Sequence, residues 1–478
     1  MSLPFILSFR KDITVTEESR DRMVIQSTRV KGNLPQYTLN LDQVSPGLFS
    51  AINSLSTAGG TEESLSDSVL QSDGFERLAT FYYYLNQFIQ LGWICHTVVG
   101  DGFPIATRVP IYPFKRFQVQ SATVEQRYTL SRFAYCHKQD NQLIIESPLS
   151  HTKVILADWR GAALVSELAQ PRTAEELCQT IPGLTPETVQ LFLGLLLSSQ
   201  MLGAVQDNGK IEEDESHSLL SWEFHDLLFH SRSRKGRHSN DSGKTFRFLD
   251  KIPQPLMVQP RMSDEIIELY QPDIEKLKAE DYSFTWVLEE RKSIRSYSDK
   301  PITVKQLGEF LYRCTRNKRI TAKDYGECTH RPYANSGGRY ELELYAIANT
   351  CDNLDSGVYH YRPEAHQLCR LTGRNENVEA LLEDAYFANG RYCMPQVLFV
   401  FAPRFQRASW VYESIAYANM LKDVGSLQQT MYLVATAMNL APCAIGGGNS
   451  DLFAATVGTD YYRETSVGEF ILGSPSVD

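Results

Sequence analysis

The feature that most constrains the fold is a long helical run between residues 411 and 450. Apolar residues recur in it at spacings of three and four, which is the pattern of a helix with one buried face. They are Tyr417, Met420, Leu421, Val424, Met431, Val434, Ala435 and Met438. The run ends in a glycine-rich segment at residues 443–450. A helix of this kind needs a core to pack against, so the run predicts a globular domain built around it.

A second stripe of the same helix carries small and polar residues. Lys422 and Gln429 are seven residues apart, nearly two turns at about 100° per residue, and therefore point the same way. Gly425 and Ser426 lie between them and leave the backbone almost bare. A flat ligand could lie against this patch, held by an amine and an amide. A glycine-softened core helix with a surface lysine explains the helix alone equally well, so motifs elsewhere must decide.

Length and charge narrow the class of protein. A chain of 478 residues exceeds one ordinary core and suggests roughly three domains. The net charge of −10 does not favour nucleic acid or an anionic membrane as a partner. No apolar stretch is long enough to span a bilayer, and the N-terminus has neither a basic start nor a small-residue cleavage site. We expect a cytoplasmic protein without a membrane partner.

Cysteine and histidine spacing indicates no metal site. The nine cysteines are scattered and never form a C-x-x-C pair, so reduced thiols are expected rather than a disulfide framework or a thiolate zinc site. The ten histidines show no H-E-x-x-H spacing.

The first 210 residues contain a weak internal repeat with a shift of 111 to 112 positions. The matched residues are Thr61, Glu63, Leu65, Glu76 and Phe81 in the first copy and Thr173, Glu175, Leu177, Glu187 and Phe192 in the second. Each copy predicts short strands, a capped helix from Ser45 or Asp158, a second short helix and a third apolar helix. The pattern predicts two tandem winged-helix-like modules, at residues 1–115 and 116–210.

The charge of these modules argues against DNA binding. Residues 1–210 hold 17 Lys plus Arg and 20 Asp plus Glu, which gives 17 − 20 = −3. The third helix, which would enter the major groove, carries only Arg77 in the first copy and no basic residue in the second. Peptide binding is the functional alternative, because an edge strand beside an apolar helix can accept an extra strand. Modules that only dimerise or cover the next domain remain the other alternative.

Residues 211–263 are expected to form a connector, and residues 264–478 alternate helices and strands in an α+β pattern. The connector includes a helical stretch at 218–231 and a polar, basic run at 232–244 that is either solvated or in contact with phosphate. Strands are expected at 340–349, 358–361, 396–403 and 467–475, and helices at 303–316 and 375–387.

Two motifs in the second half carry chemistry. Arg291, Lys292, Ser293 and Arg295 place three cations and a hydroxyl within five residues, which suits a phosphate monoester. The segment at 331–339 is rich in small residues that permit close approach of backbone to a ligand. A solvated basic turn would explain the first motif equally well, and a simple loop would explain the second.

The order of the motifs is more specific than any one of them. R-K-S-I-R, P-Y-A-N-S-G-G-R-Y before a strand, D-V-G-S-L-Q-Q in a helix and N-L-A-P-C-A-I-G-G-G resemble the FMN-dependent nitroreductase superfamily. The chain resembles more narrowly the azoline dehydrogenases of ribosomal-peptide maturation, the thiazoline oxidases of cyanobactin and microcin-type pathways. The resemblance covers residues 222–478, including 229–232 and 357–361. The paired modules resemble the leader-recognition elements of such pathways.

The resemblance implies FMN as cofactor, usually bound across a homodimer interface. Its implied phosphate and ribityl contacts are Arg291, Lys292, Ser293 and Arg295. The implied ring contacts are Ser336, Gly337 and Gly338, often from the partner subunit, with Gln429, Ile445, Gly446 and Gly447. It also implies an azoline-containing precursor peptide as substrate and is compatible with a cyclodehydratase of the same pathway as a partner.

The family assigns catalysis to a Leu-Lys-Tyr motif, which Lys422 matches. Asp423 replaces the tyrosine and is either an alternative base or a helix-surface carboxylate. The family's cationic residues near the C-terminus are also not evident. In the implied reaction the flavin takes a hydride from the azoline ring and the protein takes a proton. A pyridine-nucleotide-linked flavin reductase or nitroreductase on the same fold and a non-catalytic peptide-binding scaffold are the rival functions.

Overall fold

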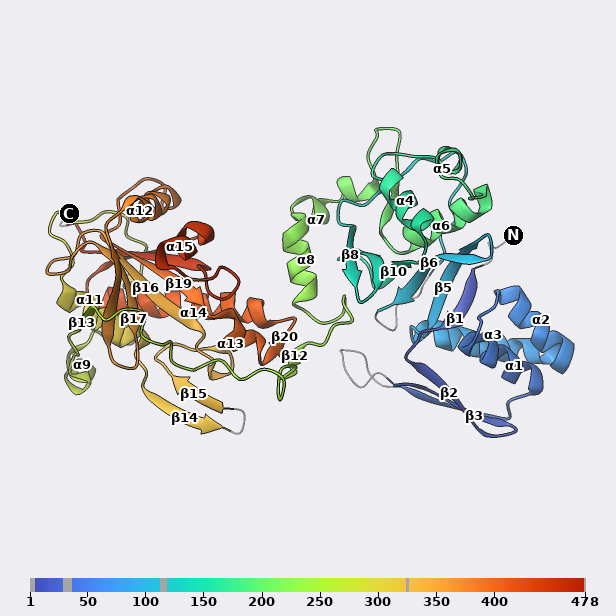
Figure 1. Ribbon diagram of the computed structural model, residues 1–478, viewed down its shortest axis with the longest axis horizontal. Coiled ribbons are helices and arrows are strands. Elements are labelled where there is room, and N and C mark those ends of the chain that lie inside the picture. The colour runs from blue at the N-terminus through green and yellow to red at the C-terminus, as the bar shows by residue number, and fades with distance from the viewer. Residues whose placement is uncertain (1–4, 29–36, 112–117, 324–325, 477–478) are drawn as a thin grey trace. The chain divides into compact units, whose positions relative to one another are not determined.

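A computed structural model describes residues 5–28, 37–111, 118–323 and 326–476. The chain forms two compact units, Met1–Ser242 and Gly243–Asp478 (Figure 1). The predicted boundary between the two modules, at 115/116, lies outside the described residues. The predicted connector, 211–263, has residues in both units.

The first unit repeats one order of elements: a strand, three further strands, three helices and a returning strand. The first copy consists of β1 (Ile6–Phe9), β2 (Ile13–Ser19), β3 (Arg22–Ser27), β4 (Thr38–Asp42), α1 (Pro46–Ser56), α2 (Glu62–Asp73), α3 (Leu78–Gln90) and β5 (Ile94–Gly100), followed by β6 (Phe103–Pro110). The second consists of β7 (Tyr128–Leu130), β8 (Tyr135–Gln139), β9 (Gln142–Glu146), β10 (Thr152–Leu156), α4 (Trp159–Glu167), α5 (Ala174–Thr180), α6 (Pro186–Ser198) and β11 (Leu202–Ala204). The prediction of tandem winged-helix-like modules is confirmed.

The repeat can be recognised in the sequence because residues close by in the chain cap its helices. Thr61 and Thr173 each accept a hydrogen bond from the backbone three residues on, and Glu176 completes a capping box with Thr173. The prediction that Ser45 caps the first helix with its own side chain is wrong. Ser45 donates to Asp73 instead, and the Asp73 carboxylate accepts the first amides of α1. A cap supplied from another helix cannot be read from local sequence.

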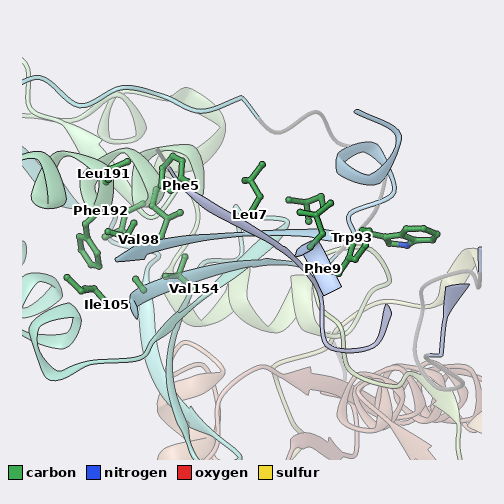
Figure 2. Packing of buried hydrophobic residues seen from close by; sticks show 14 of the residues in the cluster. Phe5, Leu7, Phe9, Trp93, Val98, Ile105, Val154, Leu191 and Phe192 are labelled. Carbon is green, nitrogen blue, oxygen red and sulfur yellow. The ribbon is translucent and has the colours of Figure 1, made fainter. Parts of the chain in front are cut away.

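One sheet joins the two copies. Its strand order is β1-β5-β6-β10-β9-β8, and β6 pairs antiparallel with β10 from Ala106↔Leu156 to Pro110↔Thr152. The strands β2-β3-β4 form a separate three-stranded sheet, and β7 pairs with β11. Both copies share one hydrophobic core, part of which Figure 2 shows with Val98, Ile105 and Phe192. The two repeats therefore form a single folded body.

The predicted helix at 218–231 is interrupted. It divides into α7 (His217–Leu220) and α8 (Phe224–Arg232). The basic run that follows is anchored to the second copy, because Arg237 donates to the backbone oxygens of Pro148 and Leu149 and Arg232 forms an ion pair with Glu146.

The second unit is an antiparallel sheet between two layers of helices. Its strand order is β13-β18-β17-β16-β19-β22-β21. The strands are β13 (Ile266–Glu268), β16 (Leu342–Ala348), β17 (Gly357–Arg362), β18 (Gln367–Gly373), β19 (Val397–Pro403), β21 (Ala441–Ile445) and β22 (Gly468–Gly473). The helices α11 (Val304–Thr315) and α14 (Ala416–Ala437) pack in one core with Leu344 and Ala346. The helices α12 (Glu376–Ala388) and α15 (Ser450–Val457) pack in another with Tyr345 and Ile347. The α+β prediction is confirmed.

Smaller elements complete the unit. They are β12 (Gly243–Lys244), α9 (Ile274–Glu280), α10 (Phe284–Glu290), a hairpin of β14 (Arg319–Lys323) and β15 (Gly326–His330), α13 (Phe405–Ser409) and β20 (Tyr412–Glu413).

The run at 411–450 is not one helix, which corrects the prediction. Near its start the run forms the strand β20, which pairs with β12. Trp410, Val411 and Tyr412 are buried there in a small hydrophobic cluster separate from the main cores. The helix α14 ends before Asn439, whose φ of 50° is left-handed, and β21 follows. Met420, Val424, Met431 and Ala435 are buried as predicted, but Tyr417 is 45% exposed.

Candidate functional site

A cavity of about 490 Å³ lies between α14, β21, β22 and the glycine turn that follows β21. It is lined by Tyr417, Leu421, Val424, Gly425 and Gln428 of α14, by Ala444, Ile445, Gly446, Gly448 and Ser450 of β21 and the turn, and by Ser466, Val467, Gly468 and Glu469 at β22. A side chain at Gly425 or Gly446 would meet no other atom within 4 Å, so both positions leave backbone open to the space. The volume is in the usual range for a small-molecule site.

The structure brings some of the predicted ring contacts to this cavity and not others. Ile445 and Gly446 line it, whereas Lys422 and Gln429 are exposed and absent from its lining. Gln428 lines it instead and donates through Nε2 to the Glu469 backbone oxygen at 3.3 Å. The assignment of Gln429 to the flavin stays a prediction.

The basic segment is tied to the cavity through one tyrosine. The Ser293 hydroxyl lies 2.8 Å from the Tyr432 hydroxyl, which accepts a hydrogen bond from Ala444 N at 2.7 Å. Ile294 N also donates to Pro442 O at 2.9 Å. The segment therefore runs beside β21, the strand that leads into the glycine turn.

The cations of this segment are available to an anion. The Arg291 guanidinium lies 5.3 Å from the centre of the Tyr432 ring. Among the described residues, no acidic side chain pairs within 4 Å with Arg291, Lys292 or Arg295. This is the electrostatic setting that a phosphate requires.

The small-residue loop meets α14 at Asp423. Ser336 donates to the Asp423 carboxylate from its backbone N and from Oγ, both at 3.0 Å to Oδ1. Asn335 Nδ2 donates to Asp423 Oδ2 at 2.9 Å and to Glu341 Oε2 at 3.1 Å. Asp423 is 4% exposed, so the alternative of a helix-surface carboxylate is wrong.

Burial raises the pKa of Asp423 to about 7, with the nearby Glu341 carboxyl adding to the effect and the Ser336 hydrogen bonds opposing it. The two buried carboxyl groups and the Asn335 amide form one hydrogen-bonded cluster that fixes the start of the loop. Glu341 gave no signal in the sequence beyond its place directly after the loop motif.

The loop itself needs glycine. Gly337 has a φ of +66°, and a Cβ there would lie 2.3 Å from the Tyr412 hydroxyl. Gly338 also has a positive φ, of +69°. Ser336, Gly337 and Gly338 are held against α14 near Asp423, and none of them lines the cavity described above. Their contact with a flavin stays a prediction.

Other site types find no support in the part of the chain that the structure describes. It contains no group of three His, Cys, Asp or Glu side chains that could hold a metal ion. The cysteines are all free thiols. No described helix has the length and apolarity required to cross a bilayer.

Three family models match the chain one after another. They are the ThcOx helix turn helix domain at residues 1–119, the cyanobactin oxidase ThcOx at 128–239 and the nitroreductase family at 288–474. A Methanocaldococcus jannaschii protein that carries a nitroreductase name is 27% identical over 188 residues, which are 38% of this chain and 85% of that protein.

Two solved structures are similar to parts of the chain. A nitroreductase-type protein of Ralstonia eutropha is 19% identical, covers 48% of this chain and 100% of its own, and has a TM-score of 0.36. The E. coli microcin synthetase McbBCD complex with truncated pro-MccB17 bound is 18% identical, covers 49% of this chain and 82% of its own, and has a TM-score of 0.33. From the matched family models, the chain combines the segments of a cyanobactin oxidase with a nitroreductase-family domain, and it is an oxidoreductase of that type.

Proposed function

We propose that this oxidoreductase oxidises azoline rings, thiazolines in particular, to azoles in a ribosomally made precursor peptide, with FMN as its cofactor. The observation that carries the proposal is the joining of three motifs around α14. The basic segment reaches the glycine turn through Tyr432, and the small-residue loop is fastened to the same helix by Asp423. The matched cyanobactin oxidase and nitroreductase models support both the peptide class and the flavin chemistry.

The residues present fit FMN. The cations of the basic segment have no acidic partner among the described residues and are available to the phosphate, and Ser293 adds a hydroxyl. The open backbone at Gly425 and Gly446 can lie against a flat ring. Arg291, Lys292, Ser293 and Arg295 would hold the phosphate end, and Ile445, Gly446 and Gly447 would approach the ring.

When bound, FMN would accept the hydride that leaves the azoline ring. The protein must take the proton from the neighbouring carbon, which the adjacent carbonyl and C=N bond make acidic enough for a moderate base. We assign this proton to Lys422, an exposed amine on α14. Asp423 is engaged by Asn335 and Ser336, and its role in the proposal is to fix the loop.

Incubation with a thiazoline-bearing peptide tests the reaction. We expect purified, yellow protein to remove two hydrogens per ring, seen as a loss of two mass units. Rapid bleaching of the bound flavin by NADPH alone, with no change in peptide mass, would favour the reductase alternative. Protein that stays colourless after refolding with FMN would favour the non-catalytic scaffold. A homodimer, and association with a cyclodehydratase of the same pathway, also belong to the proposal.

We further propose that the first module binds the peptide along β4. The support is an internal comparison between the two copies. In the second copy the edge of β10 is already covered by β6. The corresponding strand of the first copy, β4, pairs with β3 and with no other described strand. The helix α3 of the same module exposes Tyr82 and Tyr83, at 43% and 59%. An extended peptide could add to β4 as β6 adds to β10.

A single substitution can block the free edge of β4. Ser27 N donates to Tyr37 O, and by the alternation of an antiparallel pair the N–H of Asn40 points away from β3. We expect Asn40→Pro to remove a ladder donor and weaken binding of the precursor's leader segment by about fivefold, as for roughly 1 kcal/mol per hydrogen bond. Fluorescence anisotropy with labelled leader measures this.

Asn40→Ala is the matched control, because it keeps the backbone N–H and should bind as the wild type does. Equal affinity for all three proteins would exclude strand addition at β4. Tight, salt-sensitive binding of duplex DNA to the chain would contradict the peptide role altogether.

A further inference from the structure

The first unit contains a cavity that has no place in the proposed function. It measures about 500 Å³ and opens on one face of the sheet that joins the two copies. Side chains of β5, β6 and β10 form its floor, and β1 with the turn after it forms one side. The floor residues are Cys95, Thr97, Thr107, Val109, Lys153 and Ile155. The volume is in the usual range for a ligand site.

The register of the strands brings floor residues from both copies to one face of the sheet. Thr97 pairs with Thr107, and Thr107 pairs with Ile155 on the next strand. Val109 and Lys153 form the neighbouring pair, two residues along the same strands. Paired residues, and residues two apart on a strand, point to the same face of a sheet. The residues between them point to the opposite face and pack in the shared core; among them are Val98 and Val154 (Figure 2).

Positive charge predominates in the lining. Its cations are Arg10, Lys11 and Lys153, and among the described lining residues Asp12 carries the one carboxylate. Arg10 Nη2 donates to Asp12 Oδ2 at 2.9 Å, so these two charges compensate each other. The lining keeps a net charge of 3 − 1 = +2, on a chain whose net charge is −10. Charge complementarity therefore favours an acidic occupant.

The positions of the two lysines specify how the acidic groups are spaced. Lys11 follows β1 and Lys153 lies on β10, so in the order β1-β5-β6-β10 three strand spacings, about 14 Å, separate them. An extended peptide advances about 3.3 Å per residue, so about four residues span this distance. Residues i, i+2 and i+4 of an extended chain share a face. Acidic side chains at i and i+4 can therefore reach the two ammonium groups while an apolar side chain at i+2 lies over Val109 and Ile155.

The cavity adjoins the end of the module at which β4 begins. Asp12, which lines the cavity, accepts hydrogen bonds from Ser27 Oγ at 3.1 Å and, through its backbone oxygen, from Thr28 N at 2.8 Å. Ser27 N donates in turn to Tyr37 O, directly before β4. A peptide that adds antiparallel to β4, as β6 adds to β10, has its C-terminal end at this start of β4. The residues that follow it leave β4 at the end that adjoins the cavity.

We propose that this cavity binds the segment of the precursor peptide that follows the part added to β4. The segment carries two acidic side chains four positions apart, with an apolar side chain midway between them. The identity of the peptide rests on the proposed function, whereas the preference for this charge and spacing rests on the cavity alone. The floor exists only where β6 pairs with β10, so the site requires both modules and gives their tandem arrangement a role.

Three short synthetic peptides test the preference on the wild type, without any variant. The probe is fluorescein-labelled Glu-Leu-Val-Leu-Glu with a C-terminal amide, and anisotropy with the full-length protein measures its binding. Gln-Leu-Val-Leu-Gln removes both charges and should bind about ten times more weakly or less, as for the loss of a charge-assisted hydrogen bond. Glu-Leu-Val-Glu-Leu has the same composition but places its acids on opposite faces of an extended chain, and it should also bind more weakly than the probe. Equal affinity for all three would overturn the inference.

Lys153→Glu tests the position of the site. It should weaken binding of the probe by about tenfold or more and abolish the preference over the glutamine peptide. Lys138→Glu is the matched control, since Lys138 is an exposed residue of the same sheet that points to the opposite face. It pairs with Leu143, which pairs with the core residue Leu156. The control should change affinity by no more than about twofold, and equal losses in the two variants would exclude the cavity as the site.

The precursor peptide tests the assignment of the occupant. Unlabelled precursor should displace the probe from the wild type, and precursor that binds without displacing it would overturn this assignment. Absence of any preference for the acidic probe would overturn the inference and leave the thiazoline assay of the proposed function unaffected. Absence of thiazoline oxidation, with the probe still preferred and displaced, would contradict the proposed reaction and support the site.

Discussion

The double variant Arg291→Ala/Arg295→Ala is expected to bind FMN between 10² and 10⁴ times more weakly than the wild type. Each guanidinium can make a charge-assisted contact with the phosphate, worth about 1.5 to 3 kcal/mol when well formed. Neither arginine has an acidic partner among the described residues, so their removal leaves no described carboxylate unpaired. Thermal stability should therefore change little, and the loss should appear in flavin titrations alone.

Two exposed arginines of the same unit provide the matched control. Arg261 and Arg463 each pair with an acidic residue three positions away, Asp264 and Asp460. Their double replacement by alanine removes the same net charge and should leave FMN affinity within about a factor of two to three, since exposed pairs contribute little. Undiminished FMN occupancy in the Arg291/Arg295 variant would exclude the segment as the phosphate site.

The elements of the fold that sequence predicted are those specified locally. The caps at Thr61, Thr173 and Thr303 lie within three residues of the amides they bind, so the helix starts were readable. The strand β21 was missed because Ala-Pro-Cys-Ala-Ile does not alternate between apolar and polar residues. Its proline is tolerated because β21 is the edge of the seven-stranded sheet.

The site was predicted less completely, because its contacts are not local. Neighbouring helix residues differ by about 100°, so which of Gln428 and Gln429 faces the cavity depends on how α14 is rotated in its core. The environment of Asp423 is set by Ser336, 87 positions earlier. The position of Glu469 against the turn depends on the pairing of β21 with β22. None of these contacts appears in the sequence as a motif with a fixed spacing.

Lys422 and its buried neighbour Asp423 have different surroundings, so mutation can distinguish their roles. Lys422 is exposed, whereas Asp423 supports the loop through Asn335 and Ser336. We expect Asp423→Ala to lower the melting temperature, since it removes the acceptor of the Ser336 donors and one of the two acceptors of the Asn335 amide. Any fall in turnover of that variant should follow its loss of folded or flavin-bound protein.

Lys422→Ala should show the opposite behaviour. An exposed lysine contributes little packing, so the absorbance of bound FMN and the melting temperature should stay nearly unchanged. Turnover of a thiazoline peptide should fall by about 10²-fold or more, as for a lost general base. Lys422→Arg is the matched control, because it keeps the positive charge but is not deprotonated near neutral pH. Turnover restored by arginine would assign Lys422 an electrostatic role, and near wild-type thiazole formation by Lys422→Ala would remove it from the mechanism.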